Sequence, residues 1–128
     1  MALTDGHAWA TIAVSDLDRA KNFYQGTLGF KASREDPNMG ILYEAGDGTK
    51  FLVYPSQFAG TSQATCITFD VADFDVTMKD LREKGITFED YDLPYLKTVD
   101  GVAEIAGTKG AWFKDPDGNI LAIGEMQA

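Results

Sequence analysis

An internal repeat constrains the fold of this chain more than any other feature of its 128 residues. Residues 13–18 and 70–75 read AVSDLD and DVADFD, and they share a valine and two aspartates at the same relative positions, 57 residues apart (71 − 14). Self-similarity of this kind indicates one structural unit used twice. We take the two copies as residues 5–57 and 62–126, which no long linker separates.

Each copy predicts one strand, one helix and then a series of short strands. Apolar residues in the two helical segments recur every three or four positions, the spacing of an amphipathic helix. Ser15, with Asp18 three residues later, is predicted to cap the first helix, and Asp73 to cap the second. Gly29 and Gly85 stand where a left-handed residue ends a helix. The predicted elements are strands His7–Val14 and Ala64–Val71, helices Asp16–Leu28 and Asp73–Lys84, and strands Phe30–Ser33, Ile41–Glu44, Lys50–Tyr54, Ile86–Asp90, Ala103–Ala106, Gly110–Lys114 and Asn119–Gly124.

Two turns complete the pattern. Asp47-Gly48 and the segment 115–118 are typical of hairpin turns, in which glycine supplies a positive φ. The unit is therefore β-α-β-β-β. Because one such unit leaves a sheet face bare, we predict an α+β fold in which two βαβββ modules pair.

Alternation along the predicted strands separates an aliphatic face from a mixed face. Ile12 and Leu121 belong to the aliphatic set, which is expected to face the helices. The mixed set suits a ligand cleft, although antiparallel sheets also carry solvated back faces. Trp9 and Leu52 favour the cleft, since large exposed apolar patches are rare. The mixed set comprises Trp9, Thr11, Ala13, Lys50, Leu52, Tyr54, Cys66, Thr68, Asp70, Ile120, Ala122 and Gly124.

Charge and cysteine content exclude several kinds of partner. Eleven Lys and Arg against twenty Asp and Glu give a net charge of −9, which repels phosphate backbones and anionic lipids, so we expect no nucleic-acid or membrane partner. A solvated acidic face and the attraction of a cationic ligand are both open interpretations of this charge.

The single cysteine, Cys66, excludes a disulfide scaffold within the chain. The first residues, MALTDGHAW, lack the basic and apolar regions of a secretory signal, so we expect a cytoplasmic location.

Three segments resemble the vicinal-oxygen-chelate superfamily, which includes glyoxalase I, bleomycin-resistance proteins and extradiol dioxygenases. They are VSDLDRAKNFYQGTLGF (14–30), DVADFDVTMKDLREKGI (70–86) and AWFKDPDGNILAI (111–123). The resemblance covers nearly the whole chain and implies a single domain over residues 1–128. It also implies that eight strands form one mixed, cup-shaped sheet with the helices on its outer face, and that the chain is a homodimer.

In the enzymes of that superfamily the cup holds a divalent metal ion on four strand residues, usually His, Glu or Gln. The resemblance places these positions at Trp9, Leu52, Cys66 and Ala122. Trp, Leu and Ala side chains do not coordinate such an ion, and one thiol alone is too few ligands. We therefore expect no metal and no other cofactor, and none of the metal-based chemistry of those enzymes.

Other candidate residues leave alternatives open. His7 is the only histidine, and a solvated side chain is its simplest interpretation because a metal site needs partners nearby. Cys66 lacks a base at recognisable spacing, and no feature singles out a carboxylate such as Asp70 or Glu104 as a base. A three-residue loop at 116–118 would pair Trp112 with Ala122 and place the indole in the cup, whereas a four-residue loop would turn it toward the helices.

These observations predict a binding protein for a small organic molecule. Trp9, Tyr54 and Trp112 would supply stacking and cation–π contacts, so we expect a planar aromatic or cationic ligand, in the manner of the drug-resistance members that the sequence resembles. The alternative is a metal-independent or divergent lyase or isomerase of a small metabolite, and whether the chain is an enzyme stays open. The expected ligand-binding residues are Trp9, Thr11, Leu52, Tyr54, Cys66, Thr68, Trp112 and Ala122.

Overall fold

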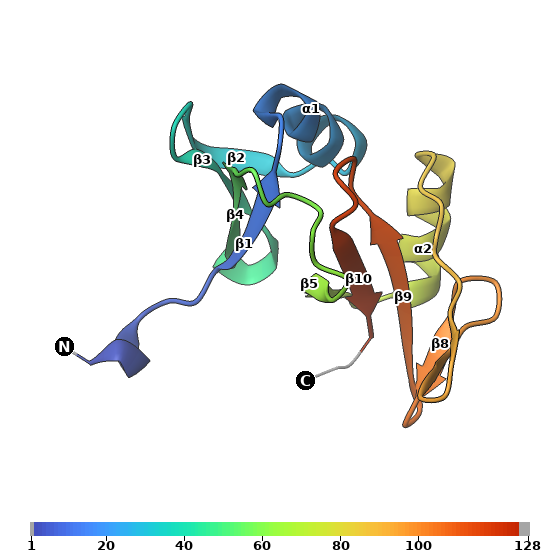
Figure 1. Cartoon of the computed structure of the whole chain (residues 1–128). Helices are drawn as coiled ribbons and strands as arrows, with labels where there is room; N and C mark the ends of the chain where they lie inside the picture. Colours follow the sequence, from blue (N-terminus) through green and yellow to red (C-terminus); the bar gives the residue numbers. More distant parts are fainter. Residues whose placement is uncertain (1, 126–128) are drawn as a thin grey trace. The chain divides into compact units, whose positions relative to one another are not determined.

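The computed structural model describes residues 2–125, and the chain divides into two compact units, residues 1–59 and 60–128. Each unit contains one four-stranded sheet and one main helical segment, coloured from blue to green and from green to red in Figure 1. The predicted α+β fold is confirmed, since the order of strand, helix and further strands occurs twice. The structure has two four-stranded mixed sheets, and the single eight-stranded cup stays a prediction.

The first unit has the strand order β1-β4-β3-β2. Strands β1 and β4 are parallel, and the other neighbours are antiparallel. Strand β1 begins at Ala10 rather than at His7, so Trp9 precedes it. The elements of this unit are η1 (Leu3–Asp5), β1 (Ala10–Val14), α1 (Leu17–Lys21), η2 (Asn22–Thr27), β2 (Lys31–Asp36), β3 (Gly40–Glu44), η3 (Gly46–Gly48) and β4 (Lys50–Pro55).

The first helix differs from the prediction at its start and along its second half. Asp16, not Ser15, caps α1, because the Asp16 carboxylate accepts a hydrogen bond from the Arg19 backbone N–H at 3.1 Å. The Ser15 hydroxyl instead accepts one from the Arg19 guanidinium, also at 3.1 Å. Asp16 is the repeat equivalent of Asp73, which caps the second helix, α2 (Phe74–Glu83), in the same way. The second half of the predicted helix, η2, is a π-helical turn.

Three fully buried aromatic rings form the core of the first unit. Tyr24 comes from η2, Tyr43 from β3 and Phe51 from β4, and their exposed fractions are 0%, 0% and 1%. The ring centroids of Tyr43 and Phe51 lie 5.4 Å apart, and Tyr24 lies 5.9 Å from each. The Tyr43 hydroxyl donates a hydrogen bond to Gln25 Oε1 at 3.0 Å. Burial raises the pKa of Tyr43 to about 12, because the phenolate would lose its hydration there.

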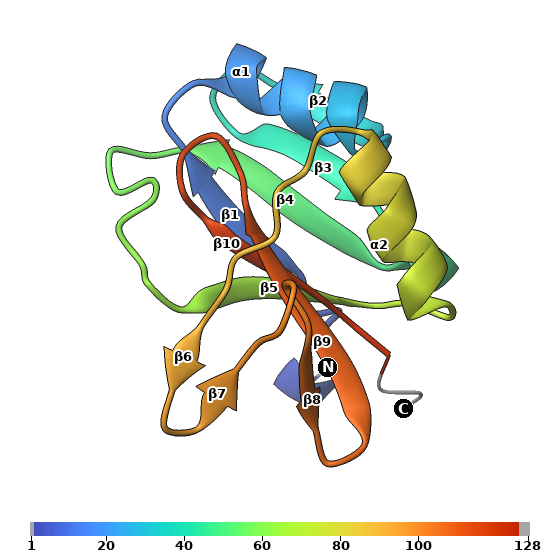
Figure 2. The same ribbon diagram turned by 90° about the vertical axis from the view of Figure 1, so that its right-hand side faces the viewer.

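The second unit has the strand order β5-β10-β9-β8, again with one parallel pair, β5 and β10. A separate two-stranded hairpin, β6 with β7, lies on the connection between α2 and β8 (Figure 2). Gly85 has a φ of 91° after α2, and Gly29 has a φ of 86° after η2, so both predicted left-handed positions are confirmed. The elements are β5 (Thr65–Asp70), α2 (Phe74–Glu83), β6 (Asp92–Leu93), β7 (Leu96–Lys97), β8 (Ala103–Ile105), β9 (Thr108–Lys114) and β10 (Ile120–Gly124).

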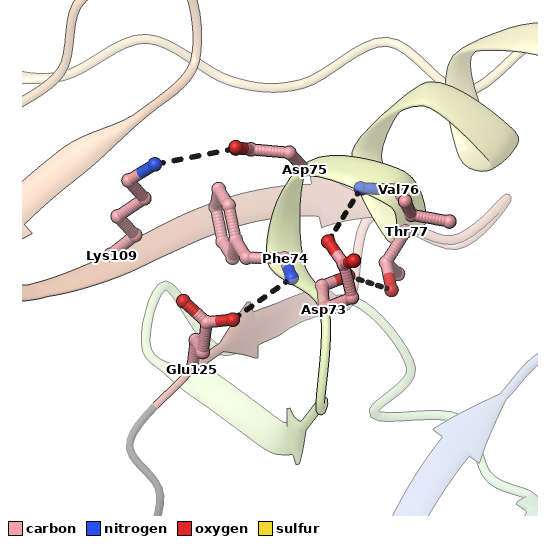
Figure 3. Close-up of polar contacts among 7 residues, drawn as sticks. All are labelled: Asp73, Phe74, Asp75, Val76, Thr77, Lys109 and Glu125. Carbon is pink, nitrogen blue, oxygen red and sulfur yellow. Dashed lines mark hydrogen bonds and ion pairs between the residues drawn. The ribbon is translucent and has the colours of Figure 1, made fainter.

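The start of α2 is fixed to the ends of two strands (Figure 3). The Asp73 carboxylate accepts a hydrogen bond from the Val76 backbone N–H at 3.1 Å, as the repeat predicts. Glu125, which directly follows β10, accepts one from the Phe74 N–H at 3.4 Å. Lys109 of β9 forms an ion pair with Asp75 at 3.4 Å. These contacts hold the helix against its own sheet, where Phe74 is buried at 1% exposure.

The predicted strand Ile86–Asp90 is wrong. Only Phe88 bridges to Phe113 of β9, and the Glu89 N–H donates to the Trp112 carbonyl at 2.8 Å. The chain then leaves the sheet and returns as β8, which pairs with residues 108–110 of β9. We call residues 90–102 the excursion. The excursion separates the Phe88 bridge from β8, and the Asp90 side chain at its start bonds to Thr98 and Gly101.

Candidate functional site

The first unit brings three of the expected ligand-binding residues together on one face of its sheet. Thr11 of β1 pairs with Leu52 of β4, and Tyr54 lies two residues farther along β4 on the same face. This is the face opposite the buried Val53, which is 0% exposed. Thr11 is exposed and both β4 residues are half-buried. Trp9 is 49% exposed and lies just before β1.

The second unit aligns three expected residues in one row. Thr68 of β5, Ala122 of β10 and Trp112 of β9 are direct neighbours across the sheet. The row lies on the face opposite Phe113 and Leu121, which are 2% and 0% exposed. Thr68 is exposed and Trp112 half-buried, whereas Ala122 retains only 4% exposure. We call this row the Trp112 face.

The turn between β9 and β10 sets the register of this face. Asp115 and Asn119 close the loop, with the Asp115 N–H donating to the Asn119 carbonyl at 3.0 Å. The loop therefore contains three residues, with Gly118 at a φ of 90°, and the predicted pairing of Trp112 with Ala122 is confirmed. The buried Asp115 carboxylate fixes the turn, because it accepts hydrogen bonds from the N–H groups of Asp117 at 3.0 Å and Asn119 at 2.9 Å.

Three residues that the sequence analysis missed hold the Trp112 indole in one orientation. Its Nε1–H donates to Thr65 Oγ1 on β5 at 3.1 Å. The ring of Tyr91 meets the indole nearly at a right angle, 83°, with centroids 5.8 Å apart. Gly110 leaves room for the ring, since a Cβ at this position would lie 3.3 Å from Trp112 Cη2. The hydrogen bond to Thr65 and the ring of Tyr91 thus favour one orientation of the indole.

Cys66 is a neutral thiol in this setting. Its Sγ donates a hydrogen bond to the Ile120 carbonyl at 3.2 Å. Burial raises the pKa of the thiol, and the negative charge of Asp115 raises it further. Because the thiolate is the reactive form, this environment opposes a nucleophilic role for Cys66.

The four positions that the resemblance assigns to metal ligands do not fit a metal ion. Trp9, Leu52 and Ala122 carry no side-chain donor for such an ion, and Cys66 holds its proton. Within residues 2–125, no three His, Cys, Asp or Glu side chains gather in a group that could hold a metal ion. His7 is exposed and lies between η1 and β1.

One hollow of the first unit is lined by other residues. It has a volume of about 440 Å³ and lies between α1 and β2, with Asp16, Lys21 and Glu35 among its walls. Lys21 and Glu35 form an ion pair across it at 3.1 Å.

Among the described residues, no helix is long and apolar enough to cross a membrane.

Comparisons with known proteins find a family model and solved structures that match nearly the whole chain. Residues 6–123 match the family model described as Glyoxalase/Bleomycin resistance protein/Dioxygenase superfamily. A search of curated proteins finds no match.

Solved structures with this fold cover nearly the full chain. A glyoxalase/bleomycin resistance protein from Streptomyces sp. CB03234 is 22% identical, with a TM-score of 0.63, over 92% of this chain and 98% of that chain. A glyoxalase family protein from Enterococcus faecalis is 26% identical, with a TM-score of 0.67, over 93% and 94%. TnmS3, an antibiotic binding protein from Streptomyces sp. CB03234, is 21% identical, with a TM-score of 0.60, over 92% and 94%. The likeness to the two Streptomyces proteins shows the fold alone.

Proposed function

Since the chain belongs to the Glyoxalase/Bleomycin resistance protein/Dioxygenase superfamily, we propose that it binds a flat aromatic organic cation without the help of a metal ion. The Trp112 face is the main contact surface of this proposal. Thr11, Leu52 and Tyr54, together with Trp9, form a separate candidate contact surface on the first unit.

The observation that carries the proposal is the fixed Trp112 indole. An aromatic ring held by a hydrogen bond to Thr65 and by the ring of Tyr91 loses little freedom when a ligand stacks on it. Such preorganisation increases affinity because less conformational entropy is lost on binding. The side chains beside it, Thr68 and Ala122, are small, which suits the close approach of a flat ring.

Two further observations support binding rather than catalysis. The donor set at the four family positions does not suit a metal ion, and Cys66 is held as a neutral thiol.

The net charge of −9 raises the local concentration of cations around the molecule. One structural neighbour, TnmS3, is described as an antibiotic binding protein, and we extend this kind of role to the chain as part of the proposal. The cytoplasm is the compartment we propose for it, since its only thiol is a free cysteine.

The test is calorimetric titration with two ligands that share one ring system. 9-Aminoacridine is a cation at neutral pH, and acridine is neutral at about pH 8. We expect 9-aminoacridine to bind more tightly, and added salt to weaken only its binding, because salt screens long-range attraction. Trp112→Ala is expected to weaken binding about tenfold, or about 1.4 kcal/mol.

Phe58→Ala is the matched control, because it removes an aromatic ring that is 66% exposed and outside the proposed site. This variant is expected to bind like the wild type. Bleomycin, which the family description names, serves as a second probe. The proposal is wrong if neither 9-aminoacridine nor bleomycin binds, or if Trp112→Ala stays folded and binds as tightly as the wild type.

A further inference from the structure

The excursion, residues 90–102, leaves the second sheet directly beside Trp112. The last backbone contact before it is the hydrogen bond from the Glu89 N–H to the Trp112 carbonyl at 2.8 Å. The first contact after it is the pairing of Ala103 with Gly110. Tyr91 therefore lies two residues beyond the point where the chain leaves the strand that carries Trp112, and its ring turns back onto the indole.

The Asp90 carboxylate closes the base of the excursion. Its Oδ1 accepts hydrogen bonds from the Thr98 hydroxyl at 2.7 Å and from the Gly101 N–H at 2.8 Å. Thr98 in turn brackets Tyr91, because its Oγ1 accepts from the Tyr91 N–H at 2.8 Å and its own N–H donates to the Tyr91 carbonyl at 2.9 Å. The backbone of Tyr91 is thus held from both sides.

A tight turn anchors the far end of the excursion. Asp100 and Gly101 have φ values of 53° and 81°, and the flanking Val99 and Val102 exchange backbone hydrogen bonds of 2.8 and 3.0 Å. Arg82 of α2 donates to the Asp100 carbonyl at 2.7 Å. Gly101 is required here, because a Cβ would lie 2.8 Å from Phe88 Cβ. Both ends of the excursion are therefore bound to the body of the second unit.

The two rings make a corner. Trp112 and Tyr91 are both half-buried and meet at 83°, so each leaves part of its surface open. A flat ring that stacks on one of them meets the other with its edge, and both geometries are favourable for aromatic rings. We propose that Tyr91 is a second ligand-contacting residue of the Trp112 face, and that Asp90 is the positioning residue that holds it there. This inference rests on the proposed function and adds a second aromatic contact, made by the edge of the ligand ring.

Variants of Tyr91 test the contact by calorimetric titration with 9-aminoacridine. Tyr91→Phe keeps the ring and is expected to bind within about twofold of the wild type. Tyr91→Ala and Tyr91→Leu remove the ring and are expected to bind about fivefold more weakly, the size of an edge-to-face aromatic contact. Tyr91→Leu keeps apolar bulk over Trp112, so it serves if Tyr91→Ala does not fold. Tyr95→Ala is the matched control, because Tyr95 belongs to the same excursion but is 83% exposed.

Variants of Asp90 test its positioning role. Asp90→Asn keeps an acceptor oxygen and is expected to retain wild-type affinity, whereas Asp90→Ala is expected to lose about as much as Tyr91→Ala. The spectroscopic readout is the NMR shift of the Trp112 indole N–H, which the ring current of Tyr91 displaces. Asp90→Ala is expected to move this signal to its position in Tyr91→Ala, and Asp90→Asn is expected to leave it unchanged.

The outcomes separate the inference from the proposed function. If folded Tyr91→Ala or Tyr91→Leu binds like the wild type while Trp112→Ala loses affinity, Tyr91 is no contact residue and the proposed function stands. Equal losses in Tyr95→Ala and Tyr91→Ala also overturn the inference, because the effect then belongs to the excursion in general. A wild-type protein that binds no 9-aminoacridine overturns the inference, and the bleomycin titration then decides the proposed function.

Discussion

The hydrogen bond between Trp112 and Thr65 offers the sharpest test of a preorganised site. Thr65→Val removes the acceptor oxygen and keeps the shape of a β-branched side chain on β5. The bond is 3.1 Å long and solvent-exposed, so water replaces it in the variant. We expect the free energy of unfolding to fall by about 0.5 kcal/mol, the lower end of the range for neutral hydrogen bonds.

The larger effect is expected in ligand binding. Without Thr65 Oγ1 the contact with Tyr91 alone restrains the indole, which then has up to about three staggered rotamers to adopt. If only one of them binds the ligand, the apparent dissociation constant rises about threefold, in proportion to the competent fraction. Thr65→Ser retains the hydroxyl and is expected to bind like the wild type.

A double-mutant cycle isolates this contact. Phenylalanine at position 112 keeps a stacking ring but has no N–H, so Thr65→Val is expected to change neither stability nor affinity in a Trp112→Phe background. Stability is measured by urea unfolding and affinity by calorimetric titration with 9-aminoacridine. An equal loss of affinity in both backgrounds would refute the reasoning, since Thr65 would then act without the indole.

Three further predictions follow from the same features. We expect the purified protein to hold no stoichiometric Ni, Zn, Fe or Mn, and EDTA to leave its melting temperature unchanged. One equivalent of tightly bound metal by elemental analysis would contradict the interpretation that Trp9, Leu52 and Ala122 cannot bind a metal ion. We expect a homodimer, with twice the 13.9 kDa chain mass by light scattering, because a partner would cover sheet edges that a monomer leaves open. A monomer mass that does not change on dilution would refute this. Burial raises the pKa of the Cys66 thiol. We therefore expect iodoacetamide to alkylate Cys66 more slowly in the native protein than in the urea-unfolded protein near pH 8, and the native rate to rise only at higher pH. Equal alkylation rates in the two states would mean that Cys66 is not shielded.

The repeat predicted most of the fold because its signals are local. Asp73 and the glycines after both helices act through neighbours a few residues away, so their spacing was enough to find them. The sequence leaves the loop at 116–118 open between three and four residues, and the structure has the three-residue loop that pairs Trp112 with Ala122. The prediction of Ser15 as the first cap is wrong, because the repeat aligns Asp16 with Asp73 and the carboxylate at the aligned position is the one that caps.

The excursion could not be predicted in the same way. Its Asp100-Gly101 turn between two valines has a local hairpin signal, but a turn there does not show that residues 86–90 fail to form a strand. The contacts around Trp112 had no such local signal. Thr65 lies 47 positions away from Trp112 in the chain, and the partner of Tyr91 is reached only after the excursion folds back. Spacing within one element carries no information about such pairs.

The central claim is that a flat aromatic cation binds on the Trp112 face of a metal-free protein. The most direct measurement is an NMR titration of EDTA-treated, isotope-labelled protein with 9-aminoacridine, followed through backbone amides and the Trp112 indole N–H. We predict that the indole signal and the amides of Thr68, Tyr91 and Ala122 shift together and saturate at one ligand per chain. Shifts confined to other residues, such as those lining the hollow between α1 and β2, would contradict the claim, as would binding that appears only after a metal ion is added.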